Sequence, residues 1–182
     1  YCILAIFGIA NVYSLSFTIS DGDWNTGGTW NAGSTPGYDD VEIRHNVTYP
    51  GAWFSVNFPS FIVKAGKTFT VAGDFGFTGN TKPVTLEPGS SLVVVTTSGD
   101  GLLISNNASV SVSGNFNATG SLTFNTSTVT IGANFNGGGT IVNLGSTITV
   151  SGDMKQGYGT FSNIGNGTLV VKQDIEFTGG AQ

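Results

Sequence analysis

The sequence predicts an all-β fold, a parallel β-solenoid with about 19–21 residues per coil and an N-terminal cap. Three observations support this prediction. A phrase of alternating apolar and hydroxyl residues recurs at a nearly constant period, a glycine recurs with the same period, and no segment has the length and periodicity of a helix.

The repeated phrase has clear copies at 67–75 (KTFTVAGDF), 108–116 (ASVSVSGNF), 127–135 (STVTIGANF), 146–154 (STITVSGDM) and 167–175 (GTLVVKQDI), and a degenerate copy around Val94. Its second apolar residue recurs with spacings of 23, 18, 19, 19 and 21, at Val71, Val94, Val112, Ile131, Val150 and Val171. A period of this size with one strand-like phrase per copy is typical of a solenoid.

Alternation of period two within each phrase indicates a strand with one apolar face and one hydroxylated face. The apolar members are predicted to point inward in stacked columns: Phe69, Val71, Val110, Val112, Val129, Ile131, Ile148, Val150, Leu169 and Val171. A glycine follows almost every phrase with spacings of 22, 19, 19, 20 and 21, at Gly79, Gly101, Gly120, Gly139, Gly159 and Gly180. A second short apolar stretch follows each glycine, which indicates two or three strands per coil.

The first sixteen residues differ from the rest. The apolar run 3–10, followed by small residues up to Ser16, indicates residues 1–16 as the remnant of a secretory signal peptide, too short to span a bilayer. The alternative is an apolar strand or helix that covers the first coil, or a strand donated to a neighbour. Cys2 is the single cysteine, so no intrachain disulfide is expected.

Residues 17–58 are rich in Trp and Gly and are predicted to cap the solenoid, whose coils are expected over 59–182. Terminal units of solenoids are atypical because they must cover unpaired strand edges and apolar core. An alternative role for the aromatic residues is a glycan-stacking platform formed by Trp24, Trp30 and Trp53.

Composition excludes several functions. Only 9% of residues are charged, against about 25% in ordinary globular domains, and the net charge is −5 with six Lys and Arg in total. Nucleic-acid binding needs a clustered basic patch, so no nucleic-acid partner is expected. No membrane span and no cofactor are expected either.

The residue before the last apolar position of each clear copy of the phrase is Asp or Asn. We predict that these residues form a stacked turn ladder, at Asp74, Asn115, Asn134, Asp153 and Asp174. The alternative is a calcium site formed by Asp153 and Asp174 on adjacent coils. His45 and Arg44 are each the only residue of their type and have no evident nucleophile partner, so no catalytic residues are assigned.

Hydroxyl residues on the other face of the phrase should form two parallel ranks on the surface, at Thr68, Thr70, Ser109, Ser111, Thr128, Thr130, Thr147 and Thr149. Such ranks resemble those of ice-binding solenoids. The ranks are interrupted at Ser91/Val93 and at Val170, and one coil has Ser in place of Thr. Outward threonine is also what strand propensity selects on an exposed face. Strand propensity is therefore the preferred explanation.

Three features resemble the repeats of filamentous-haemagglutinin-type and autotransporter-type bacterial surface proteins. They are the period near 19, the phrase with its Gly-Asn/Asp-Phe end, and the lead-in with Gly28-Thr29-Trp30 and Pro36-Gly37-Tyr38-Asp39-Asp40-Val41. The resemblance covers roughly residues 20–182. It implies right-handed parallel β-helix coils, and most often an adhesin or surface fibre. Polysaccharide-cleaving enzymes are the less frequent case, and no active-site motif of theirs is present.

We therefore expect a secreted or cell-surface, non-enzymatic structural or adhesive module, with glycans or neighbouring cell surfaces as partners. The alternatives are a carbohydrate-binding or polysaccharide-cleaving β-helix protein and, third, an ice-binding solenoid. The final phrase ends in Gly-Gly-Ala-Gln without a capping segment. This predicts either further coils beyond Gln182 or end-to-end self-association.

Overall fold

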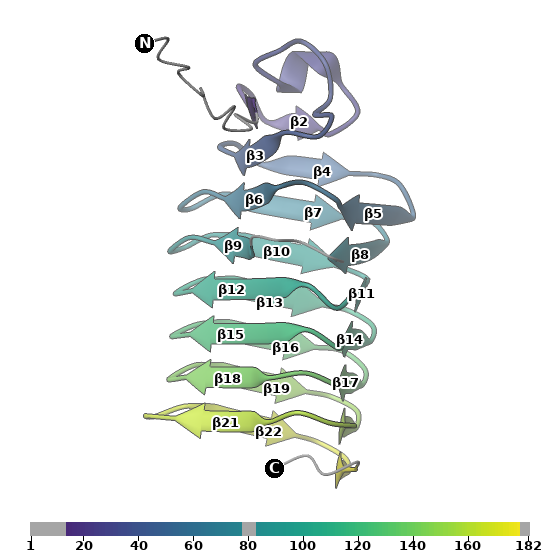
Figure 1. Cartoon of the computed structure of the whole chain (residues 1–182), viewed down its shortest axis with the longest axis vertical. Helices are drawn as coiled ribbons and strands as arrows, with labels where there is room; N and C mark the ends of the chain where they lie inside the picture. The colour runs from purple at the N-terminus through teal and green to yellow at the C-terminus, as the bar shows by residue number, and fades with distance from the viewer. Residues whose placement is uncertain (1–13, 78–82, 179–182) are drawn as a thin grey trace, which may run out of the picture.

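The computed structural model describes residues 14–77 and 83–178. In these ranges the chain is a parallel β-solenoid of three sheets, drawn as a stack of coils in Figure 1. The first sheet contains β1 (Leu15–Phe17), β3 (Asp40–Ile43), β6 (Ser60–Val63), β9 (Val84–Leu86), β12 (Leu102–Asn106), β15 (Ser121–Asn125), β18 (Ile141–Leu144) and β21 (Phe161–Ile164).

The second sheet contains the repeated phrases. Its strands are β2 (Gly22–Asp23), β4 (Val47–Tyr49), β7 (Thr68–Val71), β10 (Ser91–Val94), β13 (Ser109–Val112), β16 (Thr128–Ile131), β19 (Thr147–Val150) and β22 (Thr168–Val171). The third sheet contains β5 (Trp53–Val56), β8 (Asp74–Phe77), β11 (Thr96–Ser98), β14 (Phe116–Ala118), β17 (Phe135–Gly137), β20 (Met154–Gln156) and β23 (Ile175–Phe177). A short 3₁₀ helix, η1 (Gly27–Thr29), lies before β3.

All pairings between neighbouring coils are parallel and in register with the sequence repeat. Leu103 pairs with Leu122, and Leu122 pairs with Ile141, at a spacing of 19 residues. The spacing is 23 residues between Phe61 and Val84. The fold class predicted from the repeat is therefore confirmed, and the 23-residue coil corresponds to the longest interval in the sequence period.

The core consists of the inward columns that the alternation predicted. Eight of the ten predicted residues are buried: Phe69, Val71, Val110, Val112, Val129, Ile131, Ile148 and Val150. Leu169 and Val171 pack against the same core but are only partly buried, because they belong to the last described coil. Each inward residue stacks on its equivalent one coil away, so the core is continuous along the axis.

The recurring glycine has a steric cause. A Cβ on Gly139 would lie 1.8 Å from the backbone oxygen of Gly120, and a Cβ on Gly120 would lie 1.9 Å from that of Gly101. Any side chain at these positions would overlap the backbone of the preceding coil. The second period in the sequence therefore marks a corner where successive coils touch through their main chains.

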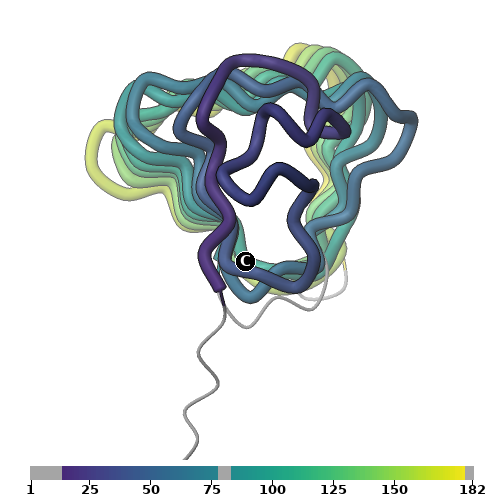
Figure 2. The backbone as a smooth tube through the Cα atoms, turned by 90° about the horizontal axis from the view of Figure 1, so that it is seen from above, coloured from purple at the N-terminus to yellow at the C-terminus, as the bar shows by residue number. Residues whose placement is uncertain are grey.

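The N-terminal end of the solenoid is closed by the segment before β3, which folds across the opening of the coils in Figure 2. Trp24 and Trp30 lie in this segment, and their ring centroids are 4.6 Å apart in an edge-to-face arrangement. The Trp30 indole N–H donates a hydrogen bond of 2.8 Å to the backbone oxygen of Trp24. Both rings are buried, so this part of the predicted cap covers the end of the core.

Coiling begins earlier than residue 59. Strands β3, β4 and β5 form a complete coil that pairs in register with β6, β7 and β8. Two shorter strands, β1 and β2, pair in turn with β3 and β4. The capping part of 17–58 is thus the segment before Asp40, and the remainder contributes the first full coil.

The predicted signal-peptide remnant lies largely outside the described residues, as does Cys2. Only its last residues are described, and Ser16 belongs to β1. Within 14–77 and 83–178, no helix has the length and hydropathy needed to cross a bilayer.

Candidate functional site

The third sheet carries a column of side chains that we call the ladder, comprising Asn115, Asn134, Asp153 and Asp174. Each directly precedes a strand of this sheet. The side-chain Oδ1 of each rung accepts a hydrogen bond from the backbone N–H of the next, at 3.1 Å from Asn134 to Asn115, 2.9 Å from Asp153 to Asn134 and 3.3 Å from Asp174 to Asp153. The fifth predicted member, Asp74, pairs with Thr96 in an intervening coil that has no Asn or Asp at this position.

A second column runs parallel to the ladder on the same outer surface. The Asn136 side-chain amide donates to the Asn117 side-chain oxygen at 2.8 Å. Further along, Lys155 and Glu176 pair in register and approach to 3.8 Å. The outer surface of the third sheet is therefore lined with amide and carboxylate groups at the spacing of the coils, about 4.8 Å.

The second sheet carries the two predicted ranks, here called the hydroxyl face. Its first column has a hydroxyl on six consecutive coils, at Thr68, Ser91, Ser109, Thr128, Thr147 and Thr168. Its second column contains Thr70, Val93, Ser111, Thr130, Thr149 and Val170. The register thus adds Ser91 and Thr168 to the first rank and places the two valines in the second. No member of either column is charged.

The three tryptophans do not form a common platform. Trp24 is 6% exposed and Trp30 is 1% exposed, because the Trp24 ring packs against core phenylalanines and the Trp30 ring packs against Trp24. A buried ring cannot stack on a ligand, so these two candidates for glycan stacking are wrong. Trp53 lies on the outer surface of β5 and is 54% exposed.

The described residues contain no group of three or more His, Cys, Asp or Glu side chains that could hold a metal ion. The calcium candidates, Asp153 and Asp174, lie on adjacent coils, where the Oδ1 of Asp153 accepts a hydrogen bond from the Asp174 backbone N–H.

His45 is held by Thr18, whose backbone oxygen lies 2.9 Å from the His45 Nδ1. The Arg44 guanidinium pairs with Glu42 at 2.6 Å and lies 3.9 Å from the centre of the Phe17 ring. These contacts give His45 and Arg44 structural roles.

Asp39 fixes the start of the first strand. It accepts hydrogen bonds from the hydroxyls of Ser14 and Ser16, the latter at 2.7 Å. The Ser14 hydroxyl, followed by that of Ser16, stabilises the ionised carboxylate and lowers the pKa of Asp39 below its usual value, against a small opposing effect of burial.

One polar network inside the solenoid was missed by sequence reasoning. The Ser127 hydroxyl lies 2.8 Å from that of Ser105, and the Ser127 backbone N–H donates to the Ser146 hydroxyl at 2.8 Å. The Ser146 backbone N–H donates to the Asn143 side chain at 2.9 Å. The available signal was the serine that opens the phrase at both Ser127 and Ser146. These buried groups satisfy each other at a corner of the coils.

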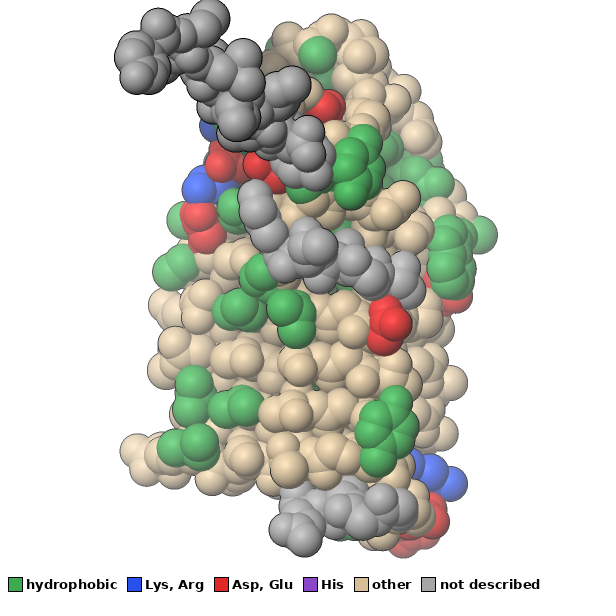
Figure 3. Space-filling model, in the orientation of Figure 1, with side chains coloured by type: hydrophobic (Ala, Val, Ile, Leu, Met, Phe, Trp, Pro, Cys, Tyr) green, Lys and Arg blue, Asp and Glu red, His purple; other side chains and the backbone are tan. Residues whose placement is uncertain are grey.

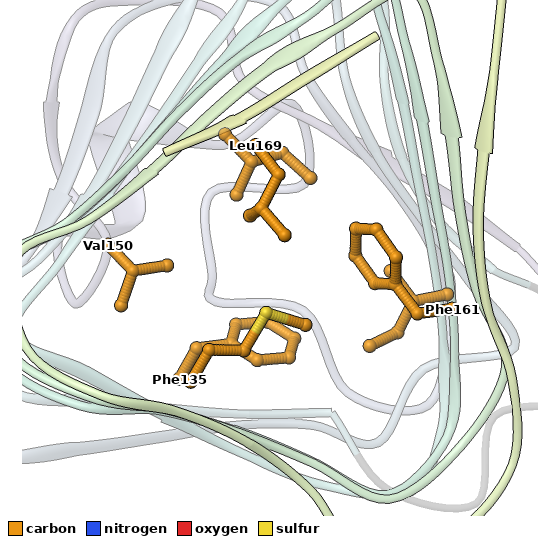
Figure 4. A pocket seen from close by; sticks show the side chains of 7 residues that line it. Phe135, Val150, Phe161 and Leu169 are labelled. Carbon is orange, nitrogen blue, oxygen red and sulfur yellow. The ribbon is translucent and has the colours of Figure 1, made fainter. Parts of the chain in front are cut away.

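An apolar pocket lies inside the last coils. It is lined by Phe135, Ile141, Ile148, Val150, Met154, Phe161 and Leu169. In Figure 4, the labelled Phe135, Val150, Phe161 and Leu169 point from different walls toward the solenoid axis. None of the lining side chains carries an acid, a base or a nucleophile, so the pocket supplies packing space and no chemistry.

The remaining candidate for a functional site is therefore the outer surface. In Figure 3 the visible side is dominated by uncharged polar side chains and backbone, with few acidic and basic groups. Such a surface offers hydrogen-bond donors and acceptors without a strong electrostatic field. No protein-family model, curated protein or solved structure matches the chain.

Proposed function

We propose that this chain is a non-enzymatic structural or adhesive β-solenoid module of a secreted or cell-surface protein, of the filamentous-haemagglutinin or autotransporter type. The observation that carries the proposal is the regular outer surface. Rows of hydroxyl, amide and carboxylate side chains repeat at the coil spacing on two of the three sheets. A rod with such a surface makes many similar polar contacts along its length, which suits attachment better than recognition of one small molecule.

The distribution of ionisable side chains supports a role without catalysis. General acid–base chemistry on a glycan needs two carboxyl groups that converge on one bond. The ladder carboxylates of Asp153 and Asp174 instead follow one another along a single column, and Asp153 is engaged with the backbone of the next coil. If the protein acts on carbohydrates, glycan binding is therefore favoured over polysaccharide cleavage.

The test is an adhesion assay with the purified 182-residue chain coupled to fluorescent beads. We expect saturable retention of the beads on bacterial or host cell layers, and competition by free protein. Beads that carry the unfolded, urea-treated chain are the matched control, since they have the same composition without the ordered rows. Retention no greater than that of the control on every surface tested would refute an adhesive role.

Ice binding is the third candidate, and one observation favours it: the first column of the hydroxyl face has a hydroxyl on six consecutive coils. Val93, Ser111 and Val170 break the uniformity of the second column. Thermal hysteresis of the wild-type chain and its loss in Thr130→Tyr, which places a bulky ring in the middle of this face, would support ice binding over adhesion.

A further inference from the structure

Trp53 is the one tryptophan whose ring is open to solvent. It is 54% exposed, whereas the other two are almost fully buried. It also stands within a strand of a regular sheet rather than in a loop, since β5 pairs along its length with β8. Large aromatic rings gain most from burial, so a half-exposed tryptophan on a rigid sheet is a candidate contact surface.

The neighbouring coil leaves room for this ring. Ser55 pairs with Gly76, two residues beyond the Trp53 pairing with Asp74. The Trp53 Cζ2 atom lies 3.3 Å from the position that a Cβ on Gly76 would occupy. The six-membered ring of the indole therefore reaches across the next coil above a residue without a side chain. Because Gly76 has no side chain there, the indole leans along the sheet and leaves its outer face accessible.

Polar groups border the ring. Asp74 pairs with Trp53 on the next coil, and its carboxylate has no hydrogen-bond or ion-pair partner among the described residues. Ser55 is exposed two residues further along β5. The site thus combines a flat apolar surface with an acceptor and a hydroxyl whose hydrogen-bonding capacity remains available.

This combination matches the chemistry of a pyranose ring, which has an apolar face of C–H groups and a rim of hydroxyls. The apolar face stacks on an indole, and a carboxylate accepts hydrogen bonds from the hydroxyl rim. The Asp74 carboxylate and the net charge of −5 disfavour polyanionic chains. We propose that Trp53, with Asp74 and Ser55, forms a binding site for a neutral glycan, which would supply the ligand chemistry for the adhesive role and rests on that proposed function.

The burial pattern of the tryptophans provides a direct readout. Because Trp24 and Trp30 are buried, acrylamide should quench mainly the fluorescence of Trp53 in the folded chain. We expect galactomannan, xyloglucan and mixed-linkage glucan, tested in turn, to include at least one that reduces this quenching. Alginate, a polyanion, should leave it unchanged. Quenching that no neutral glycan alters would overturn the proposal.

Variants locate the site. Affinity electrophoresis in gels that contain the protective glycan should show that Trp53→Ala weakens binding about tenfold or more, that Trp53→Phe retains part of it, and that Asp74→Asn weakens it several-fold. Tyr158→Ala is the matched control, because Tyr158 has the same exposed fraction of 54% and lies elsewhere on the solenoid. Equal retardation of the wild type and of folded Trp53→Ala would overturn the site.

The adhesion assay separates the two proposals. Beads with Trp53→Ala that adhere as well as the wild type would overturn the glycan site and leave the adhesive role intact. Wild-type beads that fail to adhere, with glycan protection of Trp53 still observed, would refute the adhesive role and retain the site. Circular dichroism of each variant verifies that the coils are folded.

Discussion

The side-chain Oδ1 of Asn134 accepts a hydrogen bond of 2.9 Å from the backbone N–H of Asp153, which lies one coil further along the solenoid. Asn134 in turn donates its own backbone N–H to Asn115. Each rung of the ladder therefore satisfies a main-chain group that no strand pairing reaches. The ladder joins coils at their turns, where the sheets themselves are interrupted.

Removing one rung should destabilise the fold measurably. Asn134→Ala leaves the Asp153 N–H without its acceptor, so we expect a loss of about 1–2 kcal/mol in the free energy of unfolding, measured by urea denaturation. Asn134→Asp is the control, because Asp already serves as the acceptor one coil further on. In high salt, this variant should lose much less of the free energy of unfolding. Equal losses for both variants would show that the acceptor is not what matters.

The glycine corner gives a second prediction. Gly139→Ala would place a Cβ 1.8 Å from the Gly120 backbone oxygen, so the two coils must move apart. We expect a loss of about 2–4 kcal/mol, seen as a lower melting temperature. Gly37→Ala is the control, since a Cβ there meets no atom within 4 Å, and it should change stability by less than about 0.5 kcal/mol. A Gly139→Ala protein as stable as this control would contradict the observed coil spacing.

Asp39 predicts a pH dependence at the N-terminal end. Its pKa is lowered by the Ser14 and Ser16 hydroxyls, so its contribution to stability is complete above about pH 4 and is lost as the pH falls through the lowered pKa. The difference in urea midpoint between the wild type and Asp39→Asn should therefore be present at neutral pH and decrease as the pH falls below about 4. A difference that persists unchanged in acid would contradict this role of the carboxylate.

The coil of β21–β23 predicts self-association of the 182-residue chain. These strands lie at the ends of their three sheets, and Ile164, Val170, Ile175 and Phe177 are exposed there. Exposed strand edges with apolar side chains promote pairing between chains. Sedimentation should show association that increases with concentration, weakened by Ile175→Lys and unaffected by Tyr38→Lys at the other end. A monomer at high concentration would argue against this surface as an interface.

The sequence was sufficient to predict the coils because their inward positions repeat. Residues such as Val129 and Ile148 recur at one period, so alternation and period together identify the core. The first coil was not found in this way, since β3 and β5 alternate between inward and outward side chains but do not carry the repeated phrase that defines the period.

At the candidate site, the sequence alone could not show which tryptophans are buried and which are exposed. Trp24 and Trp53 both stand near turn residues in the sequence, yet one ring fills the end of the core and the other lies outside. What separates them is strand alternation in β5, where Phe54 points inward and Trp53 therefore outward. Without the strand assignment, composition alone could not distinguish a ring that packs in the core from a ring that is exposed for contact with a ligand.

The central proposal is that this solenoid binds surfaces and leaves them chemically unchanged. The most direct measurement is prolonged incubation of the folded chain with a neutral glycan that protects Trp53, followed by size-exclusion analysis of the glycan and an assay of newly formed reducing ends. The account predicts retention of the protein on the glycan with no change in chain length and no new ends. Progressive shortening of the glycan, abolished by unfolding the protein, would contradict it.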